Sequence, residues 1–167
     1  MSTRVAYQAR SAGMFDMSIL SIDPDPRLEV ERLCDNSLKI KLENFSLEKL
    51  VSMSGKGSVI FFDGSHRCFP GSDVTVFFLE ILPRLKVGTV VHIHDIHLPD
   101  DYPEEFSNRL WSEEYILAAY LLGGSKRMNI MLPCHYLSVV EPSRTAILTS
   151  LCEEALIGGS SFWFEIV

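Results

Sequence analysis

The chain has 167 residues, of which 47% are hydrophobic and 22% charged, and this balance is typical of one globular domain with a full core. Its formal net charge of −7 argues against non-specific binding to nucleic acid or to an anionic membrane surface. No apolar run approaches the ~20 residues of a membrane span, and the first residues carry no secretory signal. We therefore expect a single domain over residues 1–167 in the cytoplasm, with neither nucleic acid nor membrane as a partner.

Strand and helix patterns alternate along the chain. Apolar runs predict strands, whereas helical spacing of apolar residues and capping residues predict helices. In chain order the predicted elements are a short helix at 5–10, a strand at 17–22, a helix through Leu28 and Leu33 with Asp25 as its cap, a strand at 37–42, a helix at 46–53, a strand from Val59, a helix at 73–82, a strand from Val90, a long helix from Pro103 to Gly123, a strand at 128–132, a helix at 145–156 and a strand at 162–167. This alternation predicts an α/β fold, a Rossmann-like three-layer sandwich with a mostly parallel sheet.

Two of the apolar runs lead directly into an aspartate. One run ends in Asp63 and continues as Gly64-Ser-His66, and the other ends in His94-Asp95. Unbroken apolar runs predict strands that are buried on both faces, as in parallel sheets. Ligands of open α/β sheets bind outside the carboxyl ends of the strands. Asp63 and Asp95 therefore predict a single ligand site, and Gly64 allows the chain to turn sharply off its strand.

Histidines surround Asp95. His92 lies deepest in its strand, which predicts a core residue, whereas His94 and His97 lie where the strand gives way to a loop and can turn toward a site. The spacing fits neither the His-x-His-x-Asp-His motif of metallo-β-lactamase-like hydrolases nor the His-x-Asp motif of non-haem iron oxygenases. A divalent cation held by Asp63, Asp95 and His94 stays an open alternative.

Asp23 and Tyr102 are further candidates for ligand contact. Asp23 follows a predicted strand and precedes a helix, where nucleotide-binding folds place a carboxylate that accepts hydrogen bonds from ribose hydroxyls. The alternative is that Asp23 only helps to cap the next helix. Tyr102 lies in the loop before the long predicted helix, so we expect it to face a substrate.

Taken together, these segments resemble class I S-adenosylmethionine-dependent methyltransferases, specifically the methyltransferase-24-like group. The matching pieces are Ser21-Ile-Asp-Pro-Asp-Pro-Arg27, Val59-Ile-Phe-Phe-Asp-Gly-Ser-His66, Leu82-Pro-Arg-Leu-Lys-Val-Gly88, His94-Asp95-Ile96 and Gly158-Gly-Ser-Ser-Phe-Trp-Phe164. The resemblance covers nearly the whole chain. It implies S-adenosylmethionine as the cofactor, a small-molecule methyl acceptor, and strands in the order 3-2-1-4-5-7-6 with the last strand antiparallel.

The resemblance also implies roles for individual residues. Those matching catalytic positions are Asp63, His66 and Asp95. Those matching cofactor contacts are Asp23, Pro24, Glu43, Asn44, Asp63, Ser65 and His66. In metal-dependent O-methyltransferases of this fold, the positions of Asp63 and of the pair His94-Asp95 hold a divalent cation, although here His94 replaces the usual acidic or amide ligand.

The beginning of the chain departs from the family pattern. The family's first strand and its Glu/Asp-x-Gly-x-Gly loop should precede the first helix, yet the chain opens with Met1-Ser-Thr-Arg-Val-Ala-Tyr-Gln-Ala, which resembles that helix itself. This predicts a domain that lacks the usual first strand, with impaired cofactor binding because the glycine loop brings the backbone close to the cofactor. Unpaired strand edges would then favour a homo-oligomer.

The residues leave other functions open. For methyl transfer, His66, His94 or His97 could act as the base, because an unperturbed imidazole titrates near pH ~6.5. One alternative is a non-catalytic remnant or self-associating binding module on the same fold. The other is a metallohydrolase that uses the histidine cluster at residues 92–97.

Overall fold

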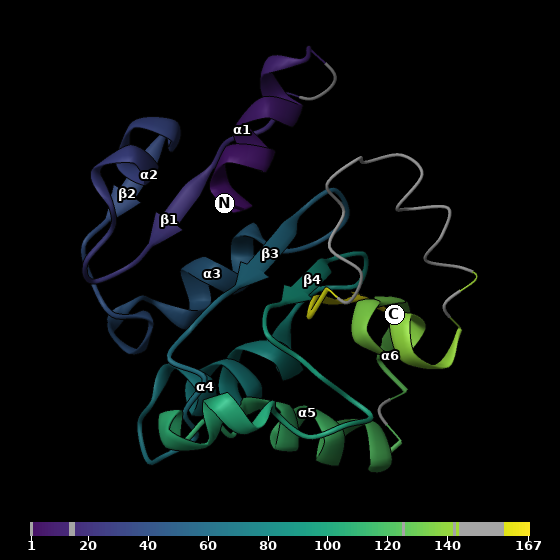
Figure 1. Ribbon diagram of the computed structural model, residues 1–167. Helices are drawn as coiled ribbons and strands as arrows, with labels where there is room; N and C mark the ends of the chain where they lie inside the picture. Colours follow the sequence, from purple (N-terminus) through teal and green to yellow (C-terminus); the bar gives the residue numbers. More distant parts are fainter. Residues whose placement is uncertain (1, 14–15, 125, 142, 144–158) are drawn as a thin grey trace. The chain divides into compact units, whose positions relative to one another are not determined.

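The computed structural model describes residues 2–13, 16–124, 126–141, 143 and 159–167 (Figure 1). The chain divides into two compact units, Met1–Lys49 and Leu50–Val167, and each is described by itself. The helix predicted at 145–156 lies outside the described residues. Among the described helices, none combines the length and the apolar composition that crossing a membrane requires.

The first unit contains a small parallel sheet. Its two strands pair with Leu20 opposite Asn36 and Ile22 opposite Leu38. The elements are α1 (Ser2–Ser11), β1 (Leu20–Ile22), α2 (Leu28–Leu33), β2 (Asn36–Leu38), the 3-10 turn η1 (Leu42–Asn44) and the start of α3 (Leu47–Met53). The predicted helices and strands are present, but both strands are shorter than predicted.

The predicted cap of α2 is wrong. The helix begins at Leu28, and the N-cap residue is Arg27, which makes no capping hydrogen bond with its side chain. The reason is local, because the backbone N–H of Asp25 donates to the Asp23 carboxylate at 2.9 Å. This turn holds Asp25 away from the helix start.

The second unit contains a four-stranded sheet in the order β3-β4-β6-β5. Its strands are β3 (Val59–Phe62), β4 (Val90–Ile93), β5 (Met128–Pro133) and β6 (Phe162–Ile166). The first two are parallel, whereas β6 runs antiparallel to both β4 and β5. This sheet has the predicted strand neighbours and the predicted antiparallel last strand.

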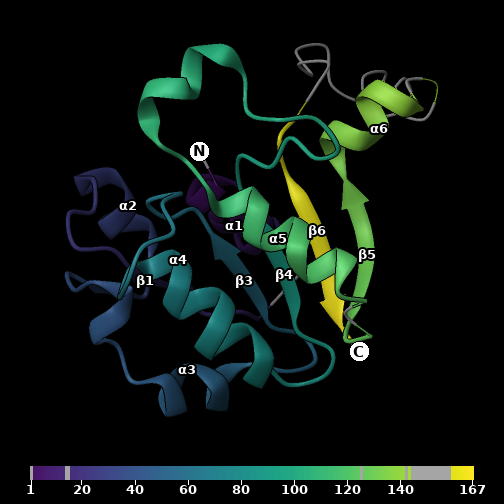
Figure 2. The ribbon, with the colours of Figure 1, turned by 90° about the horizontal axis from the view of Figure 1, so that it is seen from below.

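Helices α4 and α5 lie over one face of this sheet (Figure 2). The helical elements are α4 (Asp73–Val76), which continues as the π turn η2 (Phe77–Ile81) and the 3-10 turn η3 (Leu82–Arg84), then the 3-10 segment η4 (Glu104–Arg109), α5 (Glu113–Leu122) and α6 (Cys134–Val140). The single long helix predicted from Pro103 is wrong, because Leu110 adopts a left-handed conformation (φ 57°) that separates η4 from α5. Helix α6 was not predicted.

The core lies between the sheet and these helices. Phe62 of β3 stacks on Phe77 at a ring distance of 4.1 Å, and Phe78 and Leu117 are fully buried beside them. On β6 the buried side chains alternate, as expected for one face of a strand. The buried β6 residues are Phe162, Phe164 and Ile166.

The prediction of strands buried on both faces holds for only one of the two. In β4 the side chains of Val91, His92 and Ile93 are all buried, so His92 is a core residue as predicted. In β3, by contrast, Val59 is 62% exposed and Phe61 is 39% exposed. The two strands differ in exposure because β3 lies at the edge of its sheet, whereas β4 lies between two other strands.

Candidate functional site

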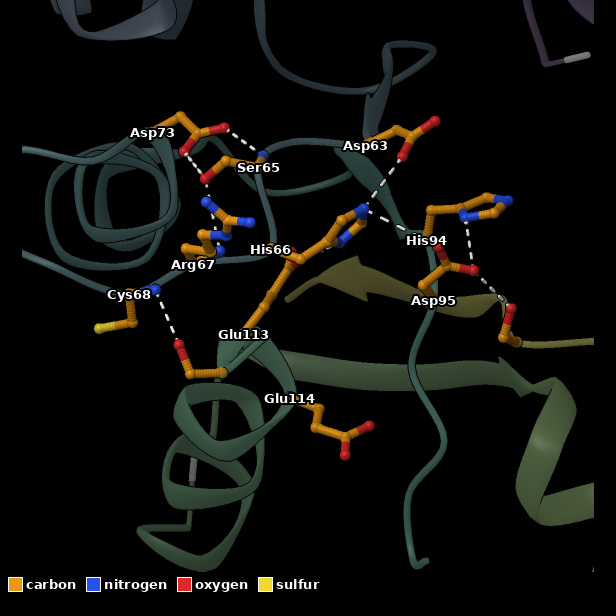
Figure 3. Close-up of polar contacts among 12 residues, drawn as sticks. Asp63, Ser65, His66, Arg67, Cys68, Asp73, His94, Asp95, Glu113 and Glu114 are labelled. Atoms are coloured by element: carbon orange, nitrogen blue, oxygen red, sulfur yellow. Dashed lines mark hydrogen bonds and ion pairs between the residues drawn. The ribbon is translucent and has the colours of Figure 1, made fainter. Parts of the chain in front are cut away.

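The ends of β3 and β4 bring Asp63, His66 and Asp95 together (Figure 3). The two strands are neighbours and parallel, so the residues that follow them emerge at the same edge. The imidazole of His66 faces both carboxylates, with its Nε2 atom 3.5 Å from Asp63 Oδ1 and 3.8 Å from Asp95 Oδ2. The three residues predicted to be catalytic therefore share one site.

The turn between β3 and α4 is fixed by Asp73. Ser65 donates to this carboxylate twice, from its backbone N–H at 2.6 Å and from its hydroxyl at 2.5 Å. A side chain at position 64 would put its Cβ 2.5 Å from Asp73 Oδ2 and 2.9 Å from the ring of Phe62. Gly64 is therefore required by close packing, and the turn delivers His66 to the site in a left-handed conformation (φ 58°).

The beginning of α5 holds His66 from the other side. Glu113, which is fully buried, places its Oε2 atom 2.7 Å from Nδ1 of His66. The His66 carbonyl accepts hydrogen bonds from the N–H groups of Ser112 and Glu113, at 2.7 and 3.2 Å. The ring of Trp111 packs against the imidazole at 4.3 Å. Carboxylates from three separate segments thus surround a single imidazole.

This arrangement favours a positively charged His66. Burial opposes the charge, but the hydrogen bonds to Asp63 and Glu113 outweigh burial and raise the pKa of His66 to about 9. The hydrogen bond from His66 lowers the pKa of Asp63. Burial opposes ionisation of Asp95, yet its contact with His94 helps to lower its pKa to about 2. Near neutral pH the site therefore holds an imidazolium between ionised aspartates, so the proton acceptors are carboxylates rather than His66.

The metal site predicted from Asp63, His94 and Asp95 is not supported. Among the described residues, no group of three or more His, Cys, Asp or Glu side chains is arranged to hold a metal ion. The Asp95 carboxylate accepts from the Ser160 hydroxyl at 3.0 Å and lies 2.9 Å from Nδ1 of His94, while the cationic His66 faces both aspartates. The place between the carboxylates thus already has a positive charge.

The histidine cluster at 92–97 does not converge on one point. His92 stacks on Phe61 at 4.0 Å and packs on Trp163 at 4.4 Å, and burial lowers its pKa to about 4. Among the described residues, no three of these side chains are arranged to hold a metal ion, so the ligand set that the metallohydrolase hypothesis requires is not found there.

A second buried glutamate lies beside His97. Glu114 is fully buried, and its Oε2 atom accepts a hydrogen bond from the backbone N–H of His97 at 2.9 Å. Burial raises the pKa of Glu114 to about 7. The backbone N–H of Glu114 donates to the hydroxyl of Tyr102 at 3.1 Å, so the tyrosine predicted to face a substrate is also part of the local structure.

Glu113 and Glu114 are the site residues that the sequence did not reveal. Acidic side chains in the first turn of a helix normally lie in solvent and favour the helix dipole. Because the sequence predicts one long helix from Pro103, it does not place Glu113 and Glu114 in the first turn of a helix. A helix start at Ser112 would have placed both residues in a first turn, but nothing in the sequence indicates that they are buried.

The remaining predicted cofactor contacts belong to the first unit. Asp23 lies at the end of β1, where its backbone N–H donates to Leu38 and its carboxylate accepts from Asp25. Pro24 follows and is exposed. Glu43 and Asn44 lie in η1, five and six residues beyond the end of β2. The structure thus places all four at or beyond the carboxyl ends of β1 and β2.

Acidic residues at the ends of neighbouring parallel strands are typical of Rossmann-like α/β proteins that bind a ligand there. The sequence model of a family described as a methyltransferase domain matches residues 1–96, which is more than half of the chain. The chain belongs to this methyltransferase family. Neither the curated proteins nor the solved structures contain a match to the sequence. Membership in the family implies a Rossmann-like fold and the use of S-adenosylmethionine.

Proposed function

We propose that the protein transfers a methyl group from S-adenosylmethionine to a small-molecule acceptor at the edge formed by Asp63, His66 and Asp95. The family match supports methyl transfer in general. The single observation that carries the assignment of the site is the His66 imidazole between the two strand-end aspartates.

The exposed Asp63 carboxylate is the part of the site that suits this cofactor. When bound, S-adenosylmethionine supplies a methyl group on a positively charged sulfur. Asp63 is about half exposed (51%), and the hydrogen bond from His66 lowers its pKa, so it presents an accessible negative charge. In the second unit, the residues proposed to contact the cofactor are Asp63, Ser65 and His66.

The chain's own residues have separate roles in this proposal. A hydroxyl or amine that accepts a methyl group must lose a proton, and a nearby carboxylate can take it. Asp63 is the more accessible of the two aspartates, because Asp95 is 23% exposed and contacts His94 and Ser160. We therefore assign proton acceptance to Asp63, orientation of both carboxylates to His66, and support of His66 to Asp95.

Calorimetric titration with S-adenosylmethionine and S-adenosylhomocysteine tests the proposal. We expect saturable binding that Asp63→Asn weakens at least about fivefold, since the variant removes a charge next to the proposed sulfonium position. Asp100→Asn is the matched control, because Asp100 is similarly exposed (57%) and also contacts a histidine, His135. Binding that is absent in a folded chain, or equal in both variants, contradicts the proposal. A micromolar dissociation constant would support it and contradict the sequence-based prediction of impaired binding.

A further inference from the structure

A hollow lined by aromatic rings adjoins the candidate site. It has a volume of about 190 Å³ and lies between the loop that follows β4 and the beginning of α5. Trp111 forms part of its wall and also packs on His66 at 4.3 Å, so this one side chain belongs to both places. A cavity of roughly 150 Å³ accommodates benzene, so this hollow has room for one ring with a short substituent.

The aromatic rings of the hollow support one another. Tyr102 contacts Trp111 at 5.7 Å and Tyr115 at 5.9 Å, both edge to face, and Phe106 packs on Trp111 at 4.9 Å. The Tyr115 hydroxyl donates to Asp101 at 2.5 Å. Because these contacts fix the rings before any ligand arrives, binding would cost little ordering of side chains.

The charge of the lining is negative. Asp101 and Glu104 contribute carboxylates, and the side chains that line the hollow, all within the described residues 101–115, include no lysine or arginine. A carboxylate or phosphate on a ligand would meet repulsion here, whereas an ammonium group would be attracted. Although Arg109 contacts two of the lining rings, the lining itself carries only negative charges and so favours a cationic ligand over an anionic one.

The protein itself shows that these rings accept a cation. The guanidinium carbon of Arg109 lies 3.9 Å from the ring centre of Phe106 and 4.7 Å from that of Trp111. Both distances are within the ~6 Å range of cation–π attraction. Two rings that line the hollow thus already interact with a positive charge from just outside the lining.

We propose that this hollow binds a small aromatic amine, with its ring among Tyr102, Phe106 and Trp111 and its ammonium group toward Glu104 and Asp101. The binding itself stands on the volume, the rings and the charge of the hollow. That the bound amine is the methyl acceptor rests on the proposed function: its ammonium group would first give a proton to a carboxylate, and its nitrogen would then bond to the methyl carbon as the sulfur–methyl bond breaks and S-adenosylhomocysteine leaves.

Three probes of similar shape and different charge test the proposal by ligand-observed NMR titration of the full chain. They are tyramine, which is cationic, 4-ethylphenol, which is neutral, and 3-(4-hydroxyphenyl)propionate, which is anionic. We expect saturable millimolar or tighter binding of tyramine, at least about tenfold weaker binding of the propionate, and intermediate binding of the neutral phenol. Failure of tyramine to saturate, or equal binding of the propionate, overturns the proposal.

Neighbouring glutamates supply the matched variants. Glu104→Gln should weaken tyramine about threefold and leave 4-ethylphenol unchanged. Glu105→Gln removes the same charge one residue further along, outside the lining, and should change neither. Phe106→Leu should weaken both ligands, since it removes a ring while keeping an apolar side chain. Equal effects of the two glutamine variants on tyramine overturn the assignment.

The titration with S-adenosylmethionine separates this inference from the proposed function. Tyramine binding without cofactor binding would retain the amine site and reject methyl transfer by this chain. Cofactor binding without tyramine binding would reject the amine site and leave the proposed methyl transfer standing.

Discussion

The charge of His66 depends on carboxylates from three segments of the second unit. Asp63 follows β3, Asp95 follows β4 and Glu113 begins α5. Glu113 is the closest of the three and is fully buried, and its Oε1 atom has no hydrogen-bond partner among the described residues. A buried carboxylate of this kind is stable mainly because it faces a positive charge, so Glu113 and His66 stabilise each other.

The stability of the fold should therefore depend on pH in two separate ranges. The folded-state pKa of His66 is about 9, above its ordinary value of 6.5, so its contribution is complete below pH 6.5 and is lost as pH rises through 9. Glu114 has a folded-state pKa of about 7, above 4.5, because burial favours its neutral form. Its contribution is complete below pH 4.5 and is lost as pH rises through 7.

Two glutamine variants separate these ranges. We expect Glu113→Gln to flatten the decline between pH 6.5 and 9, because His66 loses its nearest carboxylate. Glu114→Gln should remove the loss of stability that Glu114 contributes between pH 4.5 and 7 and leave the upper range as it is. The opposite contribution of His92, whose pKa is about 4 and which stabilises the fold as pH rises from 4 to 6.5, should remain in the variant. The measurement is the free energy of unfolding in urea at pH values from 4 to 9.5. Identical pH profiles for the two variants would show that Glu113 has no special role toward His66.

At the scale of elements, the turn from β3 to α4 positions the site. Asp73, in the first turn of α4, holds Ser65, and Ser72 caps the helix by accepting from the Thr75 N–H at 3.1 Å. The start of α4 thus fixes the conformation of the turn, and this turn positions His66. The Asp73 carboxylate can come this close to the turn because Gly64 has no side chain.

Gly64→Ala tests the packing of this turn. The added Cβ would overlap Asp73 and Phe62, so we expect a loss of about 1–3 kcal/mol in the free energy of unfolding, measured in urea. Gly159→Ala is the control, because its Cβ would meet its nearest neighbour, Cys134, at an ordinary 3.6 Å. Equal stability of the two variants would mean that the turn adjusts without cost.

The sequence predicted the strands better than it predicted the helical region after them. Apolar runs ending in Asp63 and Asp95 predicted two neighbouring strands and a candidate site at their ends. This was possible because a buried strand consists of consecutive apolar residues, which the sequence shows directly. The left-handed Leu110 that ends η4 leaves no such signal, since leucine favours helices. The burial of Glu113 also depends on His66, 47 residues away, a contact that no local pattern encodes.

At the scale of the whole molecule, β3 is the end strand of the second unit's sheet and has exposed apolar side chains. It forms one end of the order β3-β4-β6-β5, and Val59 and Phe61 on it are exposed. Strand edges of this kind pair readily with another chain. We propose β3 as the contact of the homo-oligomer expected from the sequence.

Val59→Lys tests that contact, because a charged side chain on an edge strand opposes pairing between chains. Light scattering over a range of protein concentrations should give a mass above the 18.9 kDa of one chain for the unmodified protein and a shift toward 18.9 kDa for the variant. Val87→Lys is the matched control, since Val87 is similarly exposed (66%) but lies in the turn before β4. A mass of one chain at every concentration would contradict self-association. Equal dissociation by both lysines would place the contact away from β3, because only Val59 lies on that edge.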